Sequence, residues 1–359
     1  MFYTLESYMA KQGFDVAIIG LNHGLRTILP AIAESPSVDR VYLVASHKTV
    51  GKKIEVDSNR FEVVSFESIL QMHETRVVFV ASPPATHLEL VRKSLARKKA
   101  VYCEKPGGTK TSDLELMIQF SKFYETPLTI GYQYKYDPYI QFMNNYVRHH
   151  GTNQIQEIQI DWKTQSAFSN SRQNWKLEGT RGGEVTRDFL THVLDYLDFC
   201  LPHIFSQKIS DDLEIEVETL EYDRAHINLK IVNLNLNIKV SRMSKDKASH
   251  NIKIIGRSGN LEINRFFPYG LIHGEILVNE KVVRIQDSLE LTHQLDQIIS
   301  NETFSRNLQI YAASVAIKKF LHSVDEGNDS WSCDLERTLR ITRVVDLIES
   351  QTSLKLVQP

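Results

Sequence analysis

Short apolar runs alternate with helix-length segments over the first 131 residues. Six runs have the composition of strands buried in a parallel sheet: Phe14–Gly20, Arg40–Ala45, Phe61–Val64, Arg76–Ala81, Ala100–Cys103 and Pro127–Gly131. The segments between them predict helices, among them Leu88–Lys98 and a helix that Ser112 or Asp113 caps and that ends near Tyr124. This alternation predicts a doubly wound α/β Rossmann domain over residues 1–131.

From Tyr132 onward the apolar positions recur with period two. Seven segments predict the strands of a mainly antiparallel sheet: Ile155–Trp162, Ile215–Leu220, His226–Val232, Leu234–Val240, Ile252–Ile255, Leu261–Ile263 and Glu275–Val278. Helices are expected from Pro138 to about Arg148 and from Val185 to Cys200, with Ser288–Ile299, Asn307–Val324 and Cys333–Leu347 packed on the sheet. Residues 132–359 are therefore predicted to form an α+β domain on a large open sheet, which binds substrate. Because a wide sheet face needs covering, we expect a homo-oligomer, a dimer or tetramer, formed through that face.

Composition narrows the functional class. A chain of 359 residues is too long for one ordinary core, which agrees with two domains. The formal net charge of −2 argues against nucleic acid as the main partner, and no apolar run is long enough to span a membrane. The opening 12 residues lack the pattern of a secretory signal, and three widely spaced cysteines favour neither disulfides nor zinc. We therefore expect a cytoplasmic protein without a metal site.

The turn after the first strand resembles a dinucleotide-binding fingerprint, with departures. Gly20 occupies the place of the tight-turn glycine, whereas Asn22 and Leu25 stand where the second and third glycines are usual, and Gly24 comes one residue early. Asparagine tolerates left-handed backbone angles, so a close approach to a pyrophosphate remains compatible with this turn. A cofactor contact along Gly20–Leu25, which includes His23, and a plain βα turn are equally good interpretations.

The end of the second strand bears on the choice of cofactor. An NAD site usually places a carboxylate here for the ribose hydroxyls, but this chain has Ser46, His47 and Lys48. A hydroxyl followed by two basic side chains suits a 2′-phosphate, which favours NADP over NAD. The alternative is an ordinary polar loop.

Two further strand ends carry candidate chemistry. Ala81 and Ser82-Pro83-Pro84-Ala85-Thr86-His87 lead into a helix whose free amides would face a ligand at the carboxyl edge of the sheet. The next strand ends on Glu104-Lys105-Pro106, where proline keeps Lys105 extended at the same edge. A strand-ending surface lysine is the plainer interpretation of Lys105 alone.

The helix after Gly182-Gly183 carries an acid and an imidazole. Asp188, His192 and Asp195 follow one another at spacings of four and three, so they are expected on one helical face. The rest of that helix is largely apolar, and buried polar side chains are costly unless they are paired or functional. An ordinary helical Asp–His pair is the alternative for this helix by itself.

Taken together, these motifs resemble the glucose–fructose oxidoreductase / inositol dehydrogenase (Gfo/Idh/MocA) family over almost the whole chain. The matching pieces are Gly20-Leu-Asn-His-Gly, Val80-Ala-Ser-Pro-Pro-Ala-Thr-His87, Cys103-Glu-Lys-Pro106, Gly131-Tyr-Gln-Tyr-Lys-Tyr-Asp-Pro138 and Gly182-Gly-x4-Asp-x3-His192. The resemblance implies a nicotinamide-dependent oxidoreductase that acts on a sugar, cyclitol or sugar nucleotide. It places the catalytic residues on Lys105, Asp188 and His192. It adds Glu104 and Gln133 to the expected cofactor contacts. Glu184, where a third glycine is usual, departs from the family pattern.

The residue types suggest how such a reaction would run. His192 is the expected base, because an imidazole accepts protons near neutral pH, and Asp188 would orient it or hold a hydroxyl. Lys105 would stabilise a developing alkoxide as a cation. Trp175 is expected to close over the nicotinamide or the substrate, or else to be a core residue. Tyr134 and Lys135 are expected to reach a substrate hydroxyl or phosphate, or else to lie in a solvated loop. The alternatives are a hydrolase or epimerase that uses bound nicotinamide transiently, and a non-catalytic NADP-binding sensor.

Overall fold

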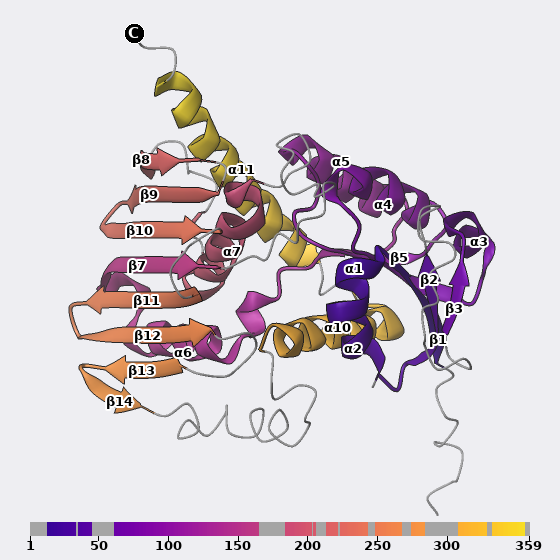
Figure 1. Cartoon of the computed structure of the whole chain (residues 1–359), viewed down its shortest axis with the longest axis horizontal. Coiled ribbons are helices and arrows are strands. Elements are labelled where there is room, and N and C mark those ends of the chain that lie inside the picture. Colours follow the sequence, from indigo (N-terminus) through magenta and orange to yellow (C-terminus); the bar gives the residue numbers. More distant parts are fainter. Residues whose placement is uncertain are drawn as a thin grey trace, which may run out of the picture.

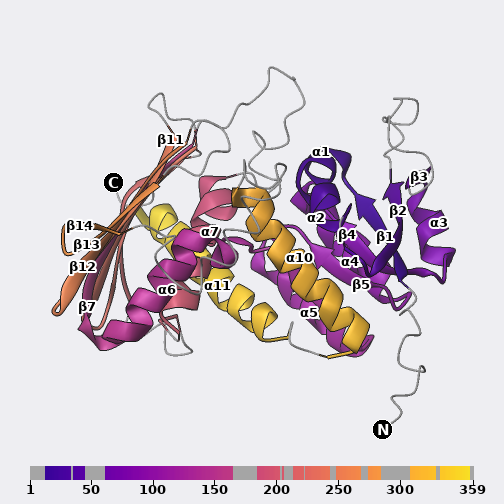
Figure 2. The ribbon, with the colours of Figure 1, turned by 90° about the horizontal axis from the view of Figure 1, so that it is seen from below.

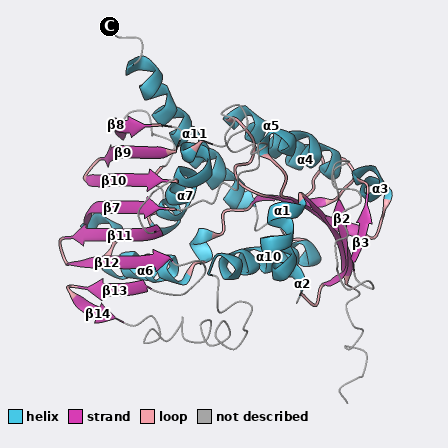
Figure 3. Cartoon of the chain, viewed as in Figure 1, coloured by secondary structure: helices cyan, strands magenta, loops and turns pink. Residues whose placement is uncertain are grey.

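The computed structural model describes residues 13–33, 35–44, 61–164, 184–202, 204–205, 213–221, 223–242, 248–267, 274–283, 308–328 and 332–355. Two sheets lie side by side with helices between and around them (Figure 1). The smaller sheet contains the N-terminal strands and the larger one the strands of the second half of the chain (Figure 3). This α/β plus α+β architecture is the one that the sequence predicted.

The N-terminal sheet has six parallel strands in the order β3-β2-β1-β4-β5-β6. These strands are β1 Phe14–Ile19, β2 Val38–Val44, β3 Phe61–Val64, β4 Thr75–Val80, β5 Ala100–Cys103 and β6 Leu128–Ile130. The strand order reverses between β1 and β4, and open α/β sheets bind ligands at the carboxyl ends of the strands beside such a reversal. The predicted doubly wound sheet is therefore confirmed, and its ligand crevice is expected beside Gly20.

Both faces of this sheet are covered, as a parallel sheet requires. One face packs on α3 Phe66–Gln71, α4 His87–Leu95 and α5 Thr111–Phe123. The other face packs on the first helical segment and on α10. The first segment comprises α1 Leu21–His23, the π-helical turn Gly24–Ile28 and α2 Leu29–Ala33, and α10 is Leu308–Glu326.

The position of α10 corrects one prediction. The helix expected over Asn307–Val324 was assigned to the antiparallel sheet, but Ile317, Phe320 and Leu321 of α10 pack with Val16 and Ile18 of β1. Amphipathic periodicity shows that a helix buries one face but not which sheet receives it. The C-terminal half of the chain thus returns to complete the N-terminal core.

The second sheet has eight strands in the order β14-β13-β12-β11-β7-β10-β9-β8. They are β7 Ile155–Lys163, β8 Leu213–Leu220, β9 Arg224–Ile231, β10 Leu234–Ser241, β11 Ala248–Gly256, β12 Gly259–Phe267, β13 Gly274–Val278 and β14 Lys281–Val283. Every pairing is antiparallel except that of β7 with β10, so the mainly antiparallel sheet is confirmed. The short strand β14 was not predicted.

Described helices pack on one face of this sheet, as the edge-on view in Figure 2 shows. They are α6 Pro138–His150, α7 Thr191–Cys200 and α11 Ser332–Lys355. Polar side chains such as Glu216, Asn228, Asn237 and Lys253 alternate with the buried positions of the strands. The polar side chains lie on the face of the sheet opposite these helices. That a partner subunit covers this second face stays a prediction, as does the domain boundary at residue 131.

Within the described residues, no helix combines the length and hydropathy needed to cross a membrane.

A buried histidine in the second domain makes stability dependent on pH. His250 is fully buried, stacks on Trp162 with ring centroids 4.6 Å apart, and shares a hydrogen bond of 3.1 Å with the Tyr196 hydroxyl. Burial holds the pKa of His250 well below its usual value, and the nearby Arg265 guanidinium acts in the same direction. The folded protein therefore keeps this imidazole neutral, whereas the unfolded chain takes up the proton near pH 6.5.

We expect the free energy of unfolding to fall as pH drops below about 6.5, by up to about 1.4 kcal/mol per pH unit for this one group. The His250→Gln variant should lose stability at every pH but show a shallower fall between pH 6.5 and 5. Urea denaturation at several pH values measures both slopes, with His149→Gln, at an exposed position of α6, as the control. Equal slopes for the wild type and His250→Gln would contradict the assignment.

Candidate active site

The turn after β1 approaches the turn after β4 very closely. Gly20 has φ +96°, and a Cβ placed on it would lie 2.3 Å from the backbone oxygen of Ala81. The Ala81 amide donates a hydrogen bond of 2.7 Å to the Ile19 carbonyl, which ties the two strand ends together. Only glycine fits this position, for both its backbone angle and the contact. The two turns lie beside the point where the strand order reverses, which is the expected place for a pyrophosphate.

Gly20→Ala is expected to destabilise the fold and to weaken dinucleotide binding. A left-handed backbone angle alone costs a non-glycine residue about 1–2 kcal/mol, and here a backbone clash adds to it. Gly327→Ala is the matched control, because Gly327 also has a positive φ of +66° but nothing within 4 Å of an added Cβ. Thermal unfolding should show a clearly larger loss for Gly20→Ala, and equal losses would mean that the contact with Ala81 is not limiting.

His87 joins two of the predicted motifs. Its ring nitrogens lie 2.7 Å from the Ser82 carbonyl and 3.0 Å from the Pro106 carbonyl, and the side chain is fully buried. Burial lowers the pKa of His87, whereas its hydrogen bonds to the Ser82 and Pro106 carbonyls act in the opposite direction. Thr86 donates to the Pro83 carbonyl at 2.8 Å and bonds the Ser82 hydroxyl at 2.6 Å. These contacts hold the Ser82–His87 turn against the end of β5.

The fingerprint turn also contacts the end of β5. His23 Nε2 lies 3.3 Å from a carboxylate oxygen of Glu104, which is 7% exposed. Burial opposes ionisation of Glu104, but His23, Lys105 and His87 together lower its pKa on balance. Asn22 is exposed, Gly24 packs against Ile18, and the partly buried Leu25 packs on the N-terminal core.

Gln133 supplies a buried amide at the end of β6. It is 1% exposed, and its Oε1 has no hydrogen-bond partner within the described part of the chain. A buried acceptor without a donor is costly, and a ligand with an amide donor would satisfy it.

Lys105 makes the connection between the two domains. The peptide bond to Pro106 is cis, and the Lys105 ammonium donates to the Asp188 carbonyl at 2.7 Å and to the Asp188 carboxylate at 2.5 Å. The second carboxylate oxygen of Asp188 lies 3.8 Å from Arg242, whose side chain is fully buried. The Phe189 ring lies 5.7 Å from the Lys105 nitrogen. Asp188 therefore holds a lysine of the N-terminal domain and faces a second cation as well.

His192 lies in an aromatic pocket one helical turn after Asp188. Asp188 belongs to the π-helical turn Thr186–Leu190, and His192 to the first turn of α7. The imidazole is 3% exposed, with ring centroids of Tyr134, Tyr132 and Trp162 at 4.7, 5.7 and 6.1 Å. Edge-to-face contacts with Tyr132 and Tyr134 and a tilted contact with Trp162 orient the imidazole.

Asp195 does not belong to this group. Its carboxylate accepts a hydrogen bond of 3.1 Å from Arg337 of α11. Asp195 is thus paired with α11, whereas Asp188 is paired with Lys105. That the three residues project from one helical face stays a prediction.

Several predicted site residues lie outside the described part of the chain: Ser46, His47, Lys48 and Trp175. The described residues contain no group of three His, Cys, Asp or Glu side chains suited to a metal ion, and the absence of a metal stays a prediction.

Sequence reasoning missed Arg242, Tyr132 and Trp162 as site residues. Arg242 had a weak signal, because it follows Val240 by two residues at an inward-facing position of a period-two segment.

Comparison with known proteins identifies the class. The model of an oxidoreductase family with an NAD-binding Rossmann fold matches residues 14–132. The matched model describes the family whose motifs the sequence resembles, Gfo/Idh/MocA, so that resemblance is confirmed over residues 14–132. These residues match a domain that binds NAD in oxidoreductases, the enzyme class that the sequence led us to expect. The prediction of a nicotinamide cofactor, NADP or NAD, is confirmed as a class.

One curated relative and two solved structures illustrate the similarity. An uncharacterised oxidoreductase of Synechocystis is 24% identical to this chain over 186 residues. The aligned region covers 51% of this chain and 50% of the Synechocystis protein, so the match spans half of that protein. A levoglucosan dehydrogenase in complex with NADH and L-sorbose superposes with a TM-score of 0.73 at 13% identity, covering 95% of this chain and 97% of the other. KijD10, a 3-ketoreductase from Actinomadura kijaniata in complex with NADP and TDP-benzene, has a TM-score of 0.71 at 17% identity, with 94% and 98% covered. At these identities the structural matches show the fold alone.

Proposed function

We propose that this chain transfers hydride between NADP or NAD and a secondary alcohol or ketone of a sugar, cyclitol or sugar nucleotide. The observation that carries the proposal is the bond from Lys105 to Asp188, which brings the lysine of the Rossmann domain to the helix that bears His192. The substrate class is supported by the L-sorbose named in the complex of one structural neighbour and by the 3-ketoreductase activity named for another.

The residues at the carboxyl edge of the parallel sheet fit a nicotinamide dinucleotide. Because Gly20 has no side chain, the turn after β1 packs directly on the backbone of Ala81 and Ser82. Both turns therefore lie at the edge of the sheet where a pyrophosphate is expected. The buried oxygen of Gln133 suits an amide donor such as the nicotinamide carboxamide. When bound, the cofactor would accept or supply the hydride. NADP is the preferred form because Ser46, His47 and Lys48 provide no carboxylate for ribose hydroxyls.

The protein groups divide the remaining work. In the proposed reaction, the Lys105 ammonium would stabilise the negative charge that develops on a substrate oxygen, since a fixed cation in a water-poor site stabilises an alkoxide strongly. His192 would take the hydroxyl proton in oxidation and return it in reduction. Asp188 acts as the anchor of Lys105, and its position between Lys105 and Arg242 suits the ionised form.

The direct test is to titrate NADP(H) and NAD(H) into the purified protein and then to screen sugars, cyclitols and sugar nucleotides by cofactor absorbance near 340 nm. We expect tighter binding of NADP(H) and a net change of absorbance with a polyol or keto-sugar substrate. Turnover of such a substrate with no net change in absorbance would indicate transient use of the cofactor and contradict the proposal. A Lys48→Asp variant with unaltered preference would contradict the role assigned to that loop.

A further inference from the structure

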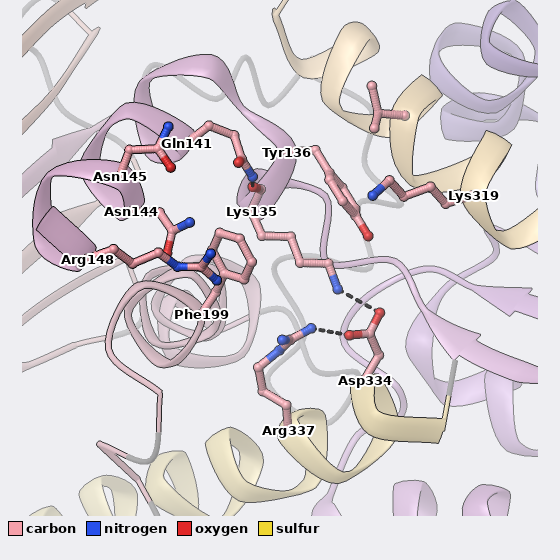
Figure 4. A pocket seen from close by; sticks show the side chains of 11 residues that line it. Lys135, Tyr136, Gln141, Asn144, Asn145, Arg148, Phe199, Lys319, Asp334 and Arg337 are labelled. Atoms are coloured by element: carbon pink, nitrogen blue, oxygen red, sulfur yellow. Dashed lines mark hydrogen bonds and ion pairs between the residues drawn. The ribbon is translucent and has the colours of Figure 1, made fainter. Parts of the chain in front are cut away.

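A cavity lies away from the proposed catalytic group. It has a volume of about 350 Å³, within the range of small-ligand sites. Its walls come from the segment after β6, from α6 and α7, and from α10 and α11, and Figure 4 shows its lining side chains. None of Lys105, Asp188 and His192 lines it.

The charged side chains of this cavity are mostly cations. Lys135, Arg148, Lys319 and Arg337 line it together with one carboxylate, Asp334. Asp334 is already bound to both Lys135, at 2.7 Å, and Arg337. Arg337 is also paired with Asp195, so four cations face two carboxylates and a formal excess of positive charge remains. Burial lowers the pKa of Lys135, which means that its surroundings disfavour this charge and an anion would relieve it.

Arg148 and Lys319 are the cations available to a ligand. Both are exposed, and neither has a carboxylate within ion-pair distance among the described residues. The Lys319 and Lys135 nitrogens lie 5.1 and 5.3 Å from the ring centre of Tyr136, which holds both ammonium groups at the cavity. A guanidinium and an ammonium group at one cavity suit an anionic ligand such as a phosphate, which Arg binds in a bidentate manner and Lys as a point charge.

Amide side chains extend the cavity beyond the cations. Gln141, Asn144 and Asn145 of α6 line it beside Arg148. Asn144 is 3% exposed, and its Oδ1 has no hydrogen-bond partner within the described residues. A buried amide oxygen of this kind could accept a hydrogen bond from a ligand hydroxyl.

We propose that this cavity binds a small phosphorylated polyol, with the phosphate on Arg148 and Lys319 and a hydroxyl on Asn144. The site lies next to the catalytic helix, because Arg337 also bonds Asp195 of α7 and Lys135 follows Tyr134, whose ring contacts His192. Its occupant therefore contacts the outer side of the elements that position His192, and the proposal does not depend on the identity of the oxidoreductase substrate.

The test is calorimetric titration of the full chain with glucose 6-phosphate, inorganic phosphate and glucose, in the presence of excess NADPH to fill the dinucleotide site. We expect glucose 6-phosphate to bind, and Arg148→Ala/Lys319→Ala to raise its Kd about tenfold or more, as loss of charged hydrogen bonds predicts. Lys318→Ala, a neighbouring exposed lysine of α10 that does not line the cavity, is the matched control and should bind as the wild type does.

The three probes separate the possible ligands. Tighter binding of glucose 6-phosphate than of inorganic phosphate supports the hydroxyl contact, and Asn144→Leu should abolish that difference. Equal binding of phosphate and glucose 6-phosphate overturns the polyol part and identifies free phosphate as the ligand. No binding of either anion, or full binding by the double variant, overturns the site itself.

Discussion

Replacing His192 by asparagine is expected to lower kcat by about 10²–10⁴-fold, the usual contribution of a positioned acid–base group. The cofactor Kd should stay close to that of the wild type, because the predicted cofactor contacts come mainly from the ends of the Rossmann strands. The expected loss follows from the removal of the imidazole held among Tyr132, Tyr134 and Trp162. Steady-state kinetics and a cofactor titration measure the two quantities separately.

The matched control is His149→Asn, which removes an exposed imidazole from α6. Thermal unfolding of both variants distinguishes a catalytic loss from a folding defect. A His192→Asn enzyme that is folded, binds cofactor and turns over at nearly the wild-type rate would show that another group moves the proton.

Replacing Asp188 by asparagine is expected to reduce both stability and activity. Breaking a buried ion pair by removing one partner costs about 3–5 kcal/mol, because a buried charge loses its counter-charge. Here the carboxylate is 5% exposed and faces both Lys105 and Arg242. kcat should fall as well, since Lys105 loses the anchor that directs its ammonium. Urea denaturation and kinetics of the variant measure these effects.

Glu89→Gln provides the comparison, because the Lys93–Glu89 pair has the same chemistry on the exposed face of α4. Such a surface pair contributes about 0–1 kcal/mol. In a double-mutant cycle, Lys105→Met should cost much less stability when Asp188→Asn is already present. Additive losses would mean that the two side chains do not stabilise each other.

Local sequence patterns were sufficient for the Rossmann half and for the location of the catalytic candidates. The apolar runs at 14–19 and 75–80, each ending in a turn with Gly20 or Ser82, follow from buried parallel strands, whose composition is distinctive. Lys105, Asp188 and His192 were predicted as candidates from their combined motifs, and the structure brings Lys105 to Asp188, whereas their catalytic role stays a prediction.

The partner of each charged side chain could not be predicted from the sequence. Asp188 and Asp195 have the same charge and lie on one helix, yet one binds Lys105 and the other Arg337, because that choice depends on tertiary packing and on a π-helical turn. The destination of α10 is of the same kind, since its apolar face would suit either sheet. Lys135 was expected in a substrate contact or a solvated loop, but it is buried and paired with Asp334.

A crystal structure of the protein with NADP bound is the most direct test of the central claim, that a lysine of one domain and an imidazole of the other act on the same nicotinamide. We expect the nicotinamide ring in one cavity with the Lys105 ammonium and the His192 imidazole, both within reach of a substrate carbon placed about 3–3.5 Å from the ring. A nicotinamide ring bound where it contacts neither side chain would contradict the account.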